Sequence, residues 1–421
     1  MAQIIIRTHR KTCWCAGLPL RVSFPSTRLL LNWFLVVMLA GNVSGCVSAI
    51  ALDRAVIAYD KTATELVAKQ LLLNIARARF NQPIHFTAIS NIAATYNFTL
   101  SAGATPALTG ERSSLLMPLL GGSVTENPTI SIAPMEGEEF TQRLLTPFQE
   151  QKLTMLLRQG YDVDALLRLL VGEVRLQKEG NQVTGDVYYN DPSDRDGYPV
   201  FRRIMAHLSS IQDRHALYIE PLLIQHTWTI PASAVTSEGF QAIYKDFSLT
   251  YNAKKQVYDV SKLVTGRIII TNYDPAILAN EERIRLHEEA EINPFNEILV
   301  DIRPGHTGGE YPLHAKIRLR SFYNVLTFIG RGMAEEREYD VTPDFRTPPI
   351  SENPVHTLEI LETDSCPSGV DLCVALNSHY YAVRPEIGYQ WNRKAFSLLY
   401  QLFQMTVSTV PQAGPAITIS K

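Results

Sequence analysis

The sequence predicts an α+β protein that combines helices with mostly antiparallel strands. Its composition, 46% hydrophobic and 19% charged, is that of a globular protein. Helical and alternating apolar patterns follow one another without an internal repeat, and some of the strand patterns are placed to form hairpins. Such a mixture argues against a doubly wound α/β fold. We therefore expect a helix-rich N-terminal part and a C-terminal part rich in strands and hairpins.

Residues 1–45 have the three parts of an export signal peptide. A basic stretch runs to Arg28, and the apolar run 29–40 (LLLNWFLVVMLA) follows it. This run is too short to span a bilayer, which takes ~20 residues. Residues 43–46 (VSGC) then resemble the lipobox of bacterial lipoproteins. The alternatives are an uncleaved anchor or an ordinary signal peptide, and the length of the basic stretch leaves a start downstream of Met1 open.

The lipobox resemblance implies an anchored protein. It implies diacylglycerol transfer to the sulfur of Cys46, cleavage before Cys46 and acylation of the new amino group. Lipoproteins of the inner membrane typically carry Asp after the cysteine, so Val47 favours the outer membrane of a Gram-negative bacterium, on its periplasmic side. A third acyl chain would make the attachment durable, because one chain alone binds membranes only marginally.

The charge of the mature chain argues against nucleic acid as a partner. Residues 1–45 carry five basic and no acidic residues, so their removal changes the net charge from −3 to −8. A mildly acidic protein has no electrostatic reason to bind nucleic acid. The partners that we expect are the membrane, through the lipid, and another envelope protein.

The region 46–177 is expected to be rich in helices. A capping box at Thr62 opens the first helix, which Asn81 and Pro83 end. Alternation predicts strands at 84–89, 95–100 and 129–133, separated by a loop at 101–127 that is rich in Gly, Ser, Thr and Pro. Helices are predicted at 138–145, 150–159 and 163–176. The polar, turn-rich segment 178–199 is expected to be a linker or a long loop.

Residues 200–421 are expected to form a C-terminal α+β domain. Helices are predicted at 200–208, 275–290, 317–333 and 391–405. Strands are predicted at 215–230, at 247–258 with a turn near Asn252, at 263–271 and at 297–302. A hairpin of 356–362 and 374–383 surrounds a pair of cysteines, and a short apolar tail follows at 415–420.

Cys366 and Cys373 are the cysteines that remain in the body of the mature chain. They are seven positions apart, around Pro367, Ser368 and Gly369, so they can meet across a hairpin. We expect them to form a disulfide in an oxidising compartment. Two free thiols are the alternative.

The loop 305–314 (GHTGGEYPLH) contains the best candidates for metal ligands, which are His306, Glu310 and His314. Gly308, Gly309 and Pro312 disfavour a helix, so the spacing does not place the three side chains on one face. A plain turn or a partner-binding loop is the favoured interpretation, and we expect neither a metal centre nor another cofactor.

Other motifs give no catalytic centre. The charged run 283–291 lacks the second histidine of a zincin helix, and neither a P-loop nor a Gly-x-Ser-x-Gly elbow is present. Four aromatic residues near the C-terminus could stack on a sugar, although aromatic core is the favoured interpretation. They are Tyr380, Tyr381, Tyr389 and Trp391.

Several segments resemble, in the same order, an uncharacterised family of proteobacterial exported proteins, many of which have lipoprotein-type leaders. These segments are 71–77 (LLLNIAR), 128–130 (PTI), 136–140 (EGEEF), 144–147 (LLTP), 320–323 (RSFY) and 394–399 (KAFSLL). The resemblance implies no activity, ligand or catalytic residue, and the Cys366/Cys373 pair is not part of the family pattern.

Three functional hypotheses follow. The first is a non-catalytic lipoprotein that acts as a scaffold, assembly or interaction factor of the envelope. The second is an envelope hydrolase with an irregular site near His306, Glu310 and His314. The third is a module that binds a glycan or a small ligand through the C-terminal aromatic residues. A deep cleft at His306 and Glu310 would favour the second hypothesis, an exposed aromatic shelf the third, and an apolar surface patch the first.

Overall fold

The computed structural model describes residues 53, 56–106, 116–177, 185–334, 336–388 and 390–407. Two compact units are present. The first comprises Met1–Ala63, Thr87–Ala133 and Pro411–Lys421, and the second comprises Thr64–Phe86 and Pro134–Val410. The predicted signal peptide, Cys46, Tyr389 and the tail 415–420 lie outside the described residues.

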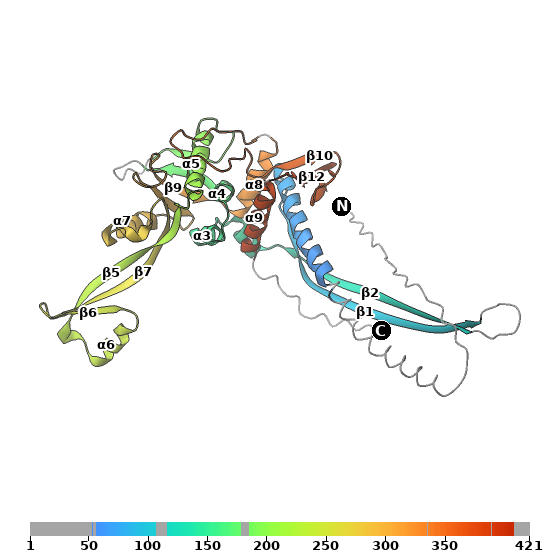
Figure 1. Ribbon diagram of the computed structural model, residues 1–421, viewed down its shortest axis with the longest axis horizontal. Helices are drawn as coiled ribbons and strands as arrows, with labels where there is room; N and C mark the ends of the chain where they lie inside the picture. Colours follow the sequence, from blue (N-terminus) through green and yellow to red (C-terminus); the bar gives the residue numbers. More distant parts are fainter. Residues whose placement is uncertain are drawn as a thin grey trace. The chain divides into compact units, whose positions relative to one another are not determined.

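The first unit contains most of a long two-stranded sheet (Figure 1). Strand β1 (Phe86–Pro106) pairs with β2 (Leu116–Met135). The prediction of a loop over 101–127 is therefore wrong at both ends of that segment. Polar and apolar residue types alternate over 128–132 (PTISI), and this period of two is compatible with a strand despite the turn-forming composition before it.

A helix over 56–79 precedes β1 and continues into the second unit. The sequence places its start at Thr62, but the Thr62 hydroxyl donates to the carbonyl of Ala58, 2.8 Å away, inside the helix. Its end agrees with the prediction, since Asn81 has a φ of 52° and lies beyond the last helical residue.

The second unit has a seven-stranded mixed sheet at its centre. The strand order is β4-β3-β9-β8-β7-β5, and β6 pairs with β7. Strands β7 and β8 run parallel, whereas the other pairs of this sheet are antiparallel. The strands are β3 (Val171–Leu176), β4 (Val187–Tyr189), β5 (Tyr218–Pro231), β6 (Ser248–Asn252), β7 (Val257–Thr271), β8 (Glu297–Ile302) and β9 (Leu313–Leu319).

Helices pack on the sheet, and a smaller sheet joins them. The helices are α2 (Glu138–Leu145), α3 (Glu150–Arg158), α4 (Val163–Leu170), α5 (Gly197–Gln212), α6 (Ser237–Tyr244), α7 (Asn280–Glu291), α8 (Phe322–Gly332) and α9 (Trp391–Thr406), with short 3₁₀ turns η1 (Ala232–Ala234) and η2 (Pro275–Ile277). The smaller sheet has the order β10-β12-β11, from β10 (Ile360–Thr363), β11 (Cys373–Leu376) and β12 (His379–Val383).

Two hydrophobic clusters cover the two faces of the central strand β8. Ile298 and Val300 belong to the large cluster that includes α4, α5, α8 and α9. Leu299 belongs to a smaller cluster, with Leu286 and Ala290 of α7. Every residue of β8 is buried, as expected for a strand that is covered on both faces. The α+β class predicted from the sequence is confirmed.

Two predicted helices each contain a strand. The range 163–176 is α4 followed by β3, and the range 317–333 is the end of β9 followed by α8. In the first range apolar residues continue from the helix into the strand at 169–171, and periodicity alone does not separate a short buried strand from a buried helix. In the second range residues 317–320 (IRLR) alternate with the period of a strand, a signal too short to separate them from the helix that follows. Ser321 marks the second boundary, because its hydroxyl accepts from the backbone N–H of Asn324 as the N-cap of α8.

The predicted linker 178–199 lies inside the second unit rather than between two domains. Strands β3 and β4, on either side of residues 178–184, pair with each other, and β3 also pairs with β9. The regions 46–177 and 200–421 therefore contribute strands to one sheet. A break in local composition does not reveal this, because the pairing of β3 with β9 joins residues far apart in the sequence.

Candidate functional site

His314, one of the predicted metal ligands, lies on β9 between two carboxylates. Its neighbours Leu313 and Ala315 are buried, so the alternation of the strand turns His314 away from the core. Its Nδ1 lies 3.1 Å from Oδ1 of Asp301 on β8, and its Nε2 lies 2.9 Å from Oε1 of Glu289 on α7. The hydrogen bonds to Asp301 and Glu289 raise the pKa of His314 to about 9.

Asp301 has further partners. The hydroxyl of Tyr273 donates to its Oδ2 over 2.5 Å, and Nε of Arg303 donates to the same oxygen over 2.6 Å. Arg303 also pairs with Glu282, 2.6 Å away. With both nitrogens facing carboxylates, His314 is an imidazolium at neutral pH. It is therefore a poor metal ligand, because a metal requires neutral imidazole.

The other two candidates do not complete a metal site with His314. His306 and Glu310 are exposed, and the His306 ring lies 5.5 Å from the ring of Tyr273. In the described part of the chain, no group of three or more His, Cys, Asp or Glu side chains is placed to hold a metal ion. Gly308 has a φ of 77°, and a Cβ there would lie 2.6 Å from the side chain of Ile211, so this glycine allows the loop to pack on α5.

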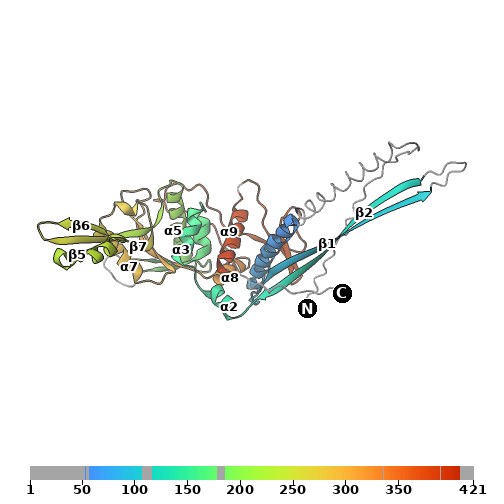
Figure 2. The same ribbon diagram turned by 90° about the horizontal axis from the view of Figure 1, so that it is seen from below.

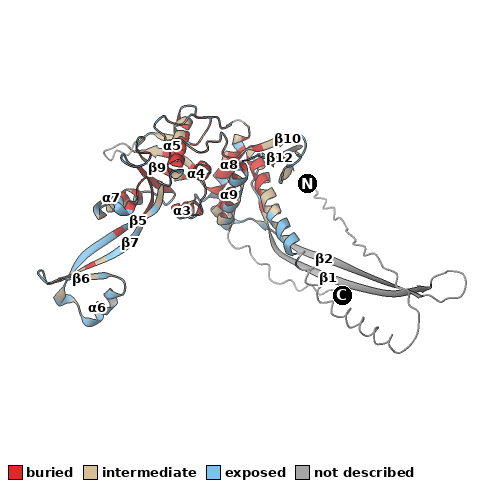
Figure 3. Cartoon of the chain, in the orientation of Figure 1, coloured by how far each residue is buried: buried red, intermediate tan, exposed pale blue. Residues whose placement is uncertain are grey.

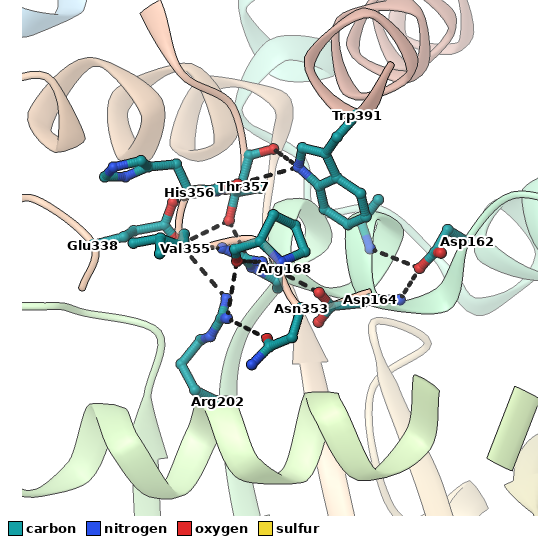
Figure 4. A network of polar contacts seen from close by, with 12 residues as sticks. Asp162, Asp164, Arg168, Arg202, Glu338, Asn353, Val355, His356, Thr357 and Trp391 are labelled. Carbon is teal, nitrogen blue, oxygen red and sulfur yellow. Dashed lines mark hydrogen bonds and ion pairs between the residues drawn. The ribbon is translucent and has the colours of Figure 1, made fainter. Parts of the chain in front are cut away.

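A buried polar network surrounds Arg168 of α4 (Figure 4). The guanidinium is fully buried and donates to side chains and carbonyl groups on all sides. Its acceptors are Thr357 Oγ1 at 2.9 Å, Asp164 Oδ2 at 3.2 Å, Glu338 Oε1 at 3.0 Å, Pro354 O at 2.8 Å and Val355 O at 2.7 Å. Burial opposes the charge, but Glu338 and Asp164 more than compensate and raise the pKa of Arg168.

The same network holds the irregular segment 338–357 against α4 and α5. Glu338 also accepts from the hydroxyls of Tyr198, at 3.0 Å, and Thr357, at 2.7 Å. Arg202 of α5 donates to Asn353 Oδ1 over 3.0 Å. Because the acid and base groups are buried and bonded to one another, we interpret the network as one that holds the fold together.

The C-terminal aromatic residues do not form the exposed shelf that a glycan would need. Tyr381 and Trp391 are buried. The indole of Trp391 donates to the carbonyl groups of His356 and Thr357, at 3.1 and 3.0 Å. Tyr380 is 36% exposed, and Tyr389 lies outside the described residues. The favoured interpretation, aromatic core, agrees with the placement of Tyr381 and Trp391.

A hollow with a volume of about 380 Å³ lies beside β9 and α8. Among its lining residues, Arg320 stacks over Phe328, 4.2 Å from the ring centre, and donates to the carbonyl of Asn190 over 2.6 Å. Burial lowers the pKa of Arg320 to about 10. Arg318 pairs with Glu173 and Glu297. Arg318 and Arg320 thus both have partners in the protein, although Nη1 of Arg320 is buried without a hydrogen-bond acceptor.

No family model, characterised protein or solved structure matches this chain. Within the described ranges, no helix has the length and apolar character needed to cross a membrane.

The outer halves of β5 and β7 leave the central sheet as an exposed arm, which we define as residues 222–266. Figures 1 and 2 show these strands running out to β6 and α6, and Figure 3 shows their exposed surface. Large apolar side chains remain uncovered along the arm: Leu223 (40% exposed), Trp228 (41%), Tyr244 (69%), Tyr251 (47%), Leu263 (58%) and Val264 (37%). Uncovered apolar side chains that gather on one element are typical of interaction sites.

The end of the arm is held by aromatic contacts. Phe240 of α6 packs edge-on against Tyr258 of β7, with ring centres 5.7 Å apart. Trp228 of β5 packs edge-on against Phe247, with ring centres 5.4 Å apart. The sequence prediction missed the arm as a site. The available signal was the segment 221–231 (PLLIQHTWTIP), which is apolar or neutral throughout and is bounded by two prolines.

Cys366 and Cys373 lie close together next to β11. Their sulfur atoms are at disulfide distance, and their Cα atoms are 6.2 Å apart. Strand β12 returns along β11 through Asn377 and Ser378, which have φ values of 50° and 68°. The predicted strand 374–383 is therefore itself a hairpin, and β10 pairs with its second half. Whether the thiols are oxidised in the mature protein stays a prediction.

Proposed function

We propose that this chain is a lipid-anchored protein on the periplasmic side of the outer membrane that acts as a non-catalytic assembly or interaction factor. The leader and Cys46 support the anchor, together with the resemblance to exported proteobacterial lipoproteins. The single observation that carries the interaction role is the exposed arm, residues 222–266. Neither the hydrolase nor the ligand-binding hypothesis is favoured by an observation of its own.

The arm supports an interaction role on physical grounds. From Leu223 to His226 the arm is a two-stranded ribbon, and from Thr227 on β6 adds a third strand on the far side of β7. The residues of β5 from Leu223 to Thr229 are exposed except Ile224. A ribbon of two strands is marginally stable in water unless something packs against it. Covering the apolar side chains of the arm with a partner would stabilise both the ribbon and the complex.

The test is photo-crosslinking in living cells that make the full-length chain. A photoreactive amino acid is placed at Leu263 or Tyr244 on the arm, and at Phe345, which is 93% exposed, as the control. We expect the two arm positions to give discrete adducts with protein of the envelope and the control position to give none. The proposal would be contradicted if the arm positions gave no adducts, or if Phe345 gave as much adduct as they do.

A further inference from the structure

Strand β5 is an edge strand of the large sheet, with β7 on one side only. At Gln225 its open edge is covered by one side chain of α7. The amide of Asn280 accepts from the backbone N–H of Gln225 over 2.8 Å and donates to its carbonyl over 2.9 Å. The backbone groups of Gln225 therefore point away from β7, toward the open edge.

The backbone N–H and C=O groups of Thr227 and Thr229 point to the open edge as well. The register of β5 with β7 runs without a shift from Leu223 to Pro231, and backbone direction alternates along a strand. Ala232 supports this assignment. It lies two positions after Ile230, so both should face β7, and its N–H donates to the carbonyl of Gln256, the residue before β7. Over the described residues, no side chain or backbone group outside β5 bonds to the outward N–H or C=O of Thr227 or Thr229.

This piece of edge also lacks the usual protection against pairing. Natural edge strands are commonly protected by charged residues, prolines or bulges. Strand β5 has a bulge near Pro221 and the Asn280 contact at Gln225. From Leu222 to Ile230 it contains no Lys, Arg, Asp or Glu. The segment 226–230 (HTWTI) is thus an uncharged edge with free hydrogen-bonding groups and an exposed Trp228.

We propose that a second copy of this chain pairs with this edge, antiparallel, about a two-fold axis at Trp228. In this register Thr227 lies opposite Thr229 of the second copy, and Thr229 lies opposite its Thr227. Each of the two pairs exchanges two backbone hydrogen bonds. The sequence is symmetric about the axis, with threonine on either side of Trp228. The two tryptophans face each other at a non-hydrogen-bonded position, where side chains come closest.

The pairing ends by itself at both sides, which favours a second copy over an extended peptide. One step further out, Gln225 would lie opposite Pro231 of the second copy. The groups of Gln225 are already taken by Asn280, and proline has no N–H to donate. A two-fold axis makes this limit identical on the two sides, so the contact closes as a dimer rather than extending. The proposal rests on the proposed function, for which it names the partner.

The first test maps the register by cysteine cross-linking of the full-length chain in membranes, in a Cys366→Ala/Cys373→Ala background. Trp228→Cys should form a disulfide-linked dimer by itself, because the two Cα atoms at this position would lie ~4.5 Å apart. His226→Cys and Ile230→Cys should each stay monomeric, since each lies about four residues from its own copy. Mixed together, they should cross-link. Phe345→Cys, at an exposed position outside the arm, measures random collision.

The second test keeps the tryptophan. Thr227→Pro/Thr229→Pro removes the four outward N–H donors of a dimer, and Thr227→Ala/Thr229→Ala is the matched control that keeps them. Light scattering of the detergent-solubilised chain should show a dimer for the wild type and the alanine variant. For the proline variant we expect a Kd roughly 100-fold weaker. The cross-linking test does not depend on this variant folding.

Several results would overturn the dimer. They are a monomeric wild type, no cross-link at Trp228→Cys, or a His226→Cys variant that cross-links alone as well as in the mixture. If the arm still gives adducts with another envelope protein while Trp228→Cys stays monomeric, the proposed function stands and the dimer is wrong. If both experiments are negative, both proposals are wrong.

Discussion

His314 carries its positive charge between Asp301 and Glu289, and this makes the stability of the fold depend on pH. The pKa of His314 is raised from 6.5 to about 9 by hydrogen bonds to Asp301 and then Glu289. In the folded state the group therefore holds its proton more tightly than in the unfolded state. Its contribution to stability is complete below the unfolded pKa and is lost as the pH rises through about 9.

We predict that His314→Gln destabilises the protein more at about pH 6 than at about pH 10. The side chain is 37% exposed, so solvent screening makes the effect modest. The measurement is the free energy of unfolding by denaturant, for wild type and variant, at a series of pH values. Glu289→Gln removes one of the two negative charges that face His314 and should give a smaller difference of the same sign. A loss that is the same at every pH would contradict the prediction.

At the scale of elements, Arg168 joins α4 to the irregular segment 338–357. Four of its five hydrogen bonds go to that segment, through Thr357, Glu338, Pro354 and Val355. Segment 338–357 contains no helix or strand, so side-chain contacts of this kind take the place of a backbone ladder. The position of the segment therefore depends on one buried cation and its acceptors.

Arg168→Met should lower the free energy of unfolding by ~3–5 kcal/mol, because it leaves Glu338 buried without its main cationic partner. Glu338→Gln should also destabilise the protein, by leaving the guanidinium under-compensated. The double variant should lose less than the sum of the two single losses, since each single change leaves the other member of the pair as an unpaired buried charge and the double change leaves neither. Denaturant unfolding of the four proteins measures this coupling. Strict additivity would show that the pair does not act as a unit.

At the scale of the whole molecule, our proposal places a large folded unit after a signal peptide and a lipidated Cys46. The second unit holds its sheet, its helices and the arm in one body, from Thr64 to Val410 with a gap at Thr87–Ala133. Within the described residues no helix is long and apolar enough to cross a membrane. In our proposal the anchor is the lipid on Cys46, and its loss should release the protein without unfolding it.

We predict that Cys46→Ser abolishes labelling by a fatty-acid probe in growing cells and moves the chain from the outer-membrane fraction. Lipid chains provide the affinity for the bilayer, and the serine hydroxyl does not accept the diacylglycerol. The measurements are in-gel detection of the probe and fractionation of envelopes. Cys366→Ser/Cys373→Ser is the control and should keep its label. A Cys46→Ser chain that is still labelled would contradict the lipoprotein interpretation.

The sequence by itself determined the elements whose pattern is local. It predicted the strand over 297–302, the helix that becomes α9 and the α+β class, because period and composition are properties of neighbouring residues. The same reasoning merged α4 with β3, where apolar residues continue across the boundary, and it merged β9 with α8. What separates these elements is the pairing of β3 with β9, which local pattern does not contain.

The partners and burial of the candidate residues were determined by the tertiary structure alone. His314 has its partners on α7 and β8, and Arg168 finds Glu338 170 positions further along the chain. Burial and charge pairing depend on such distant contacts, so a histidine in a promising loop and an arginine in an apolar helix look ambiguous in the sequence. The uncharged edge of β5 is visible in the sequence as 221–231. Only the folded sheet reveals that this segment is an edge strand and that Asn280 bonds to Gln225 but not to Thr227.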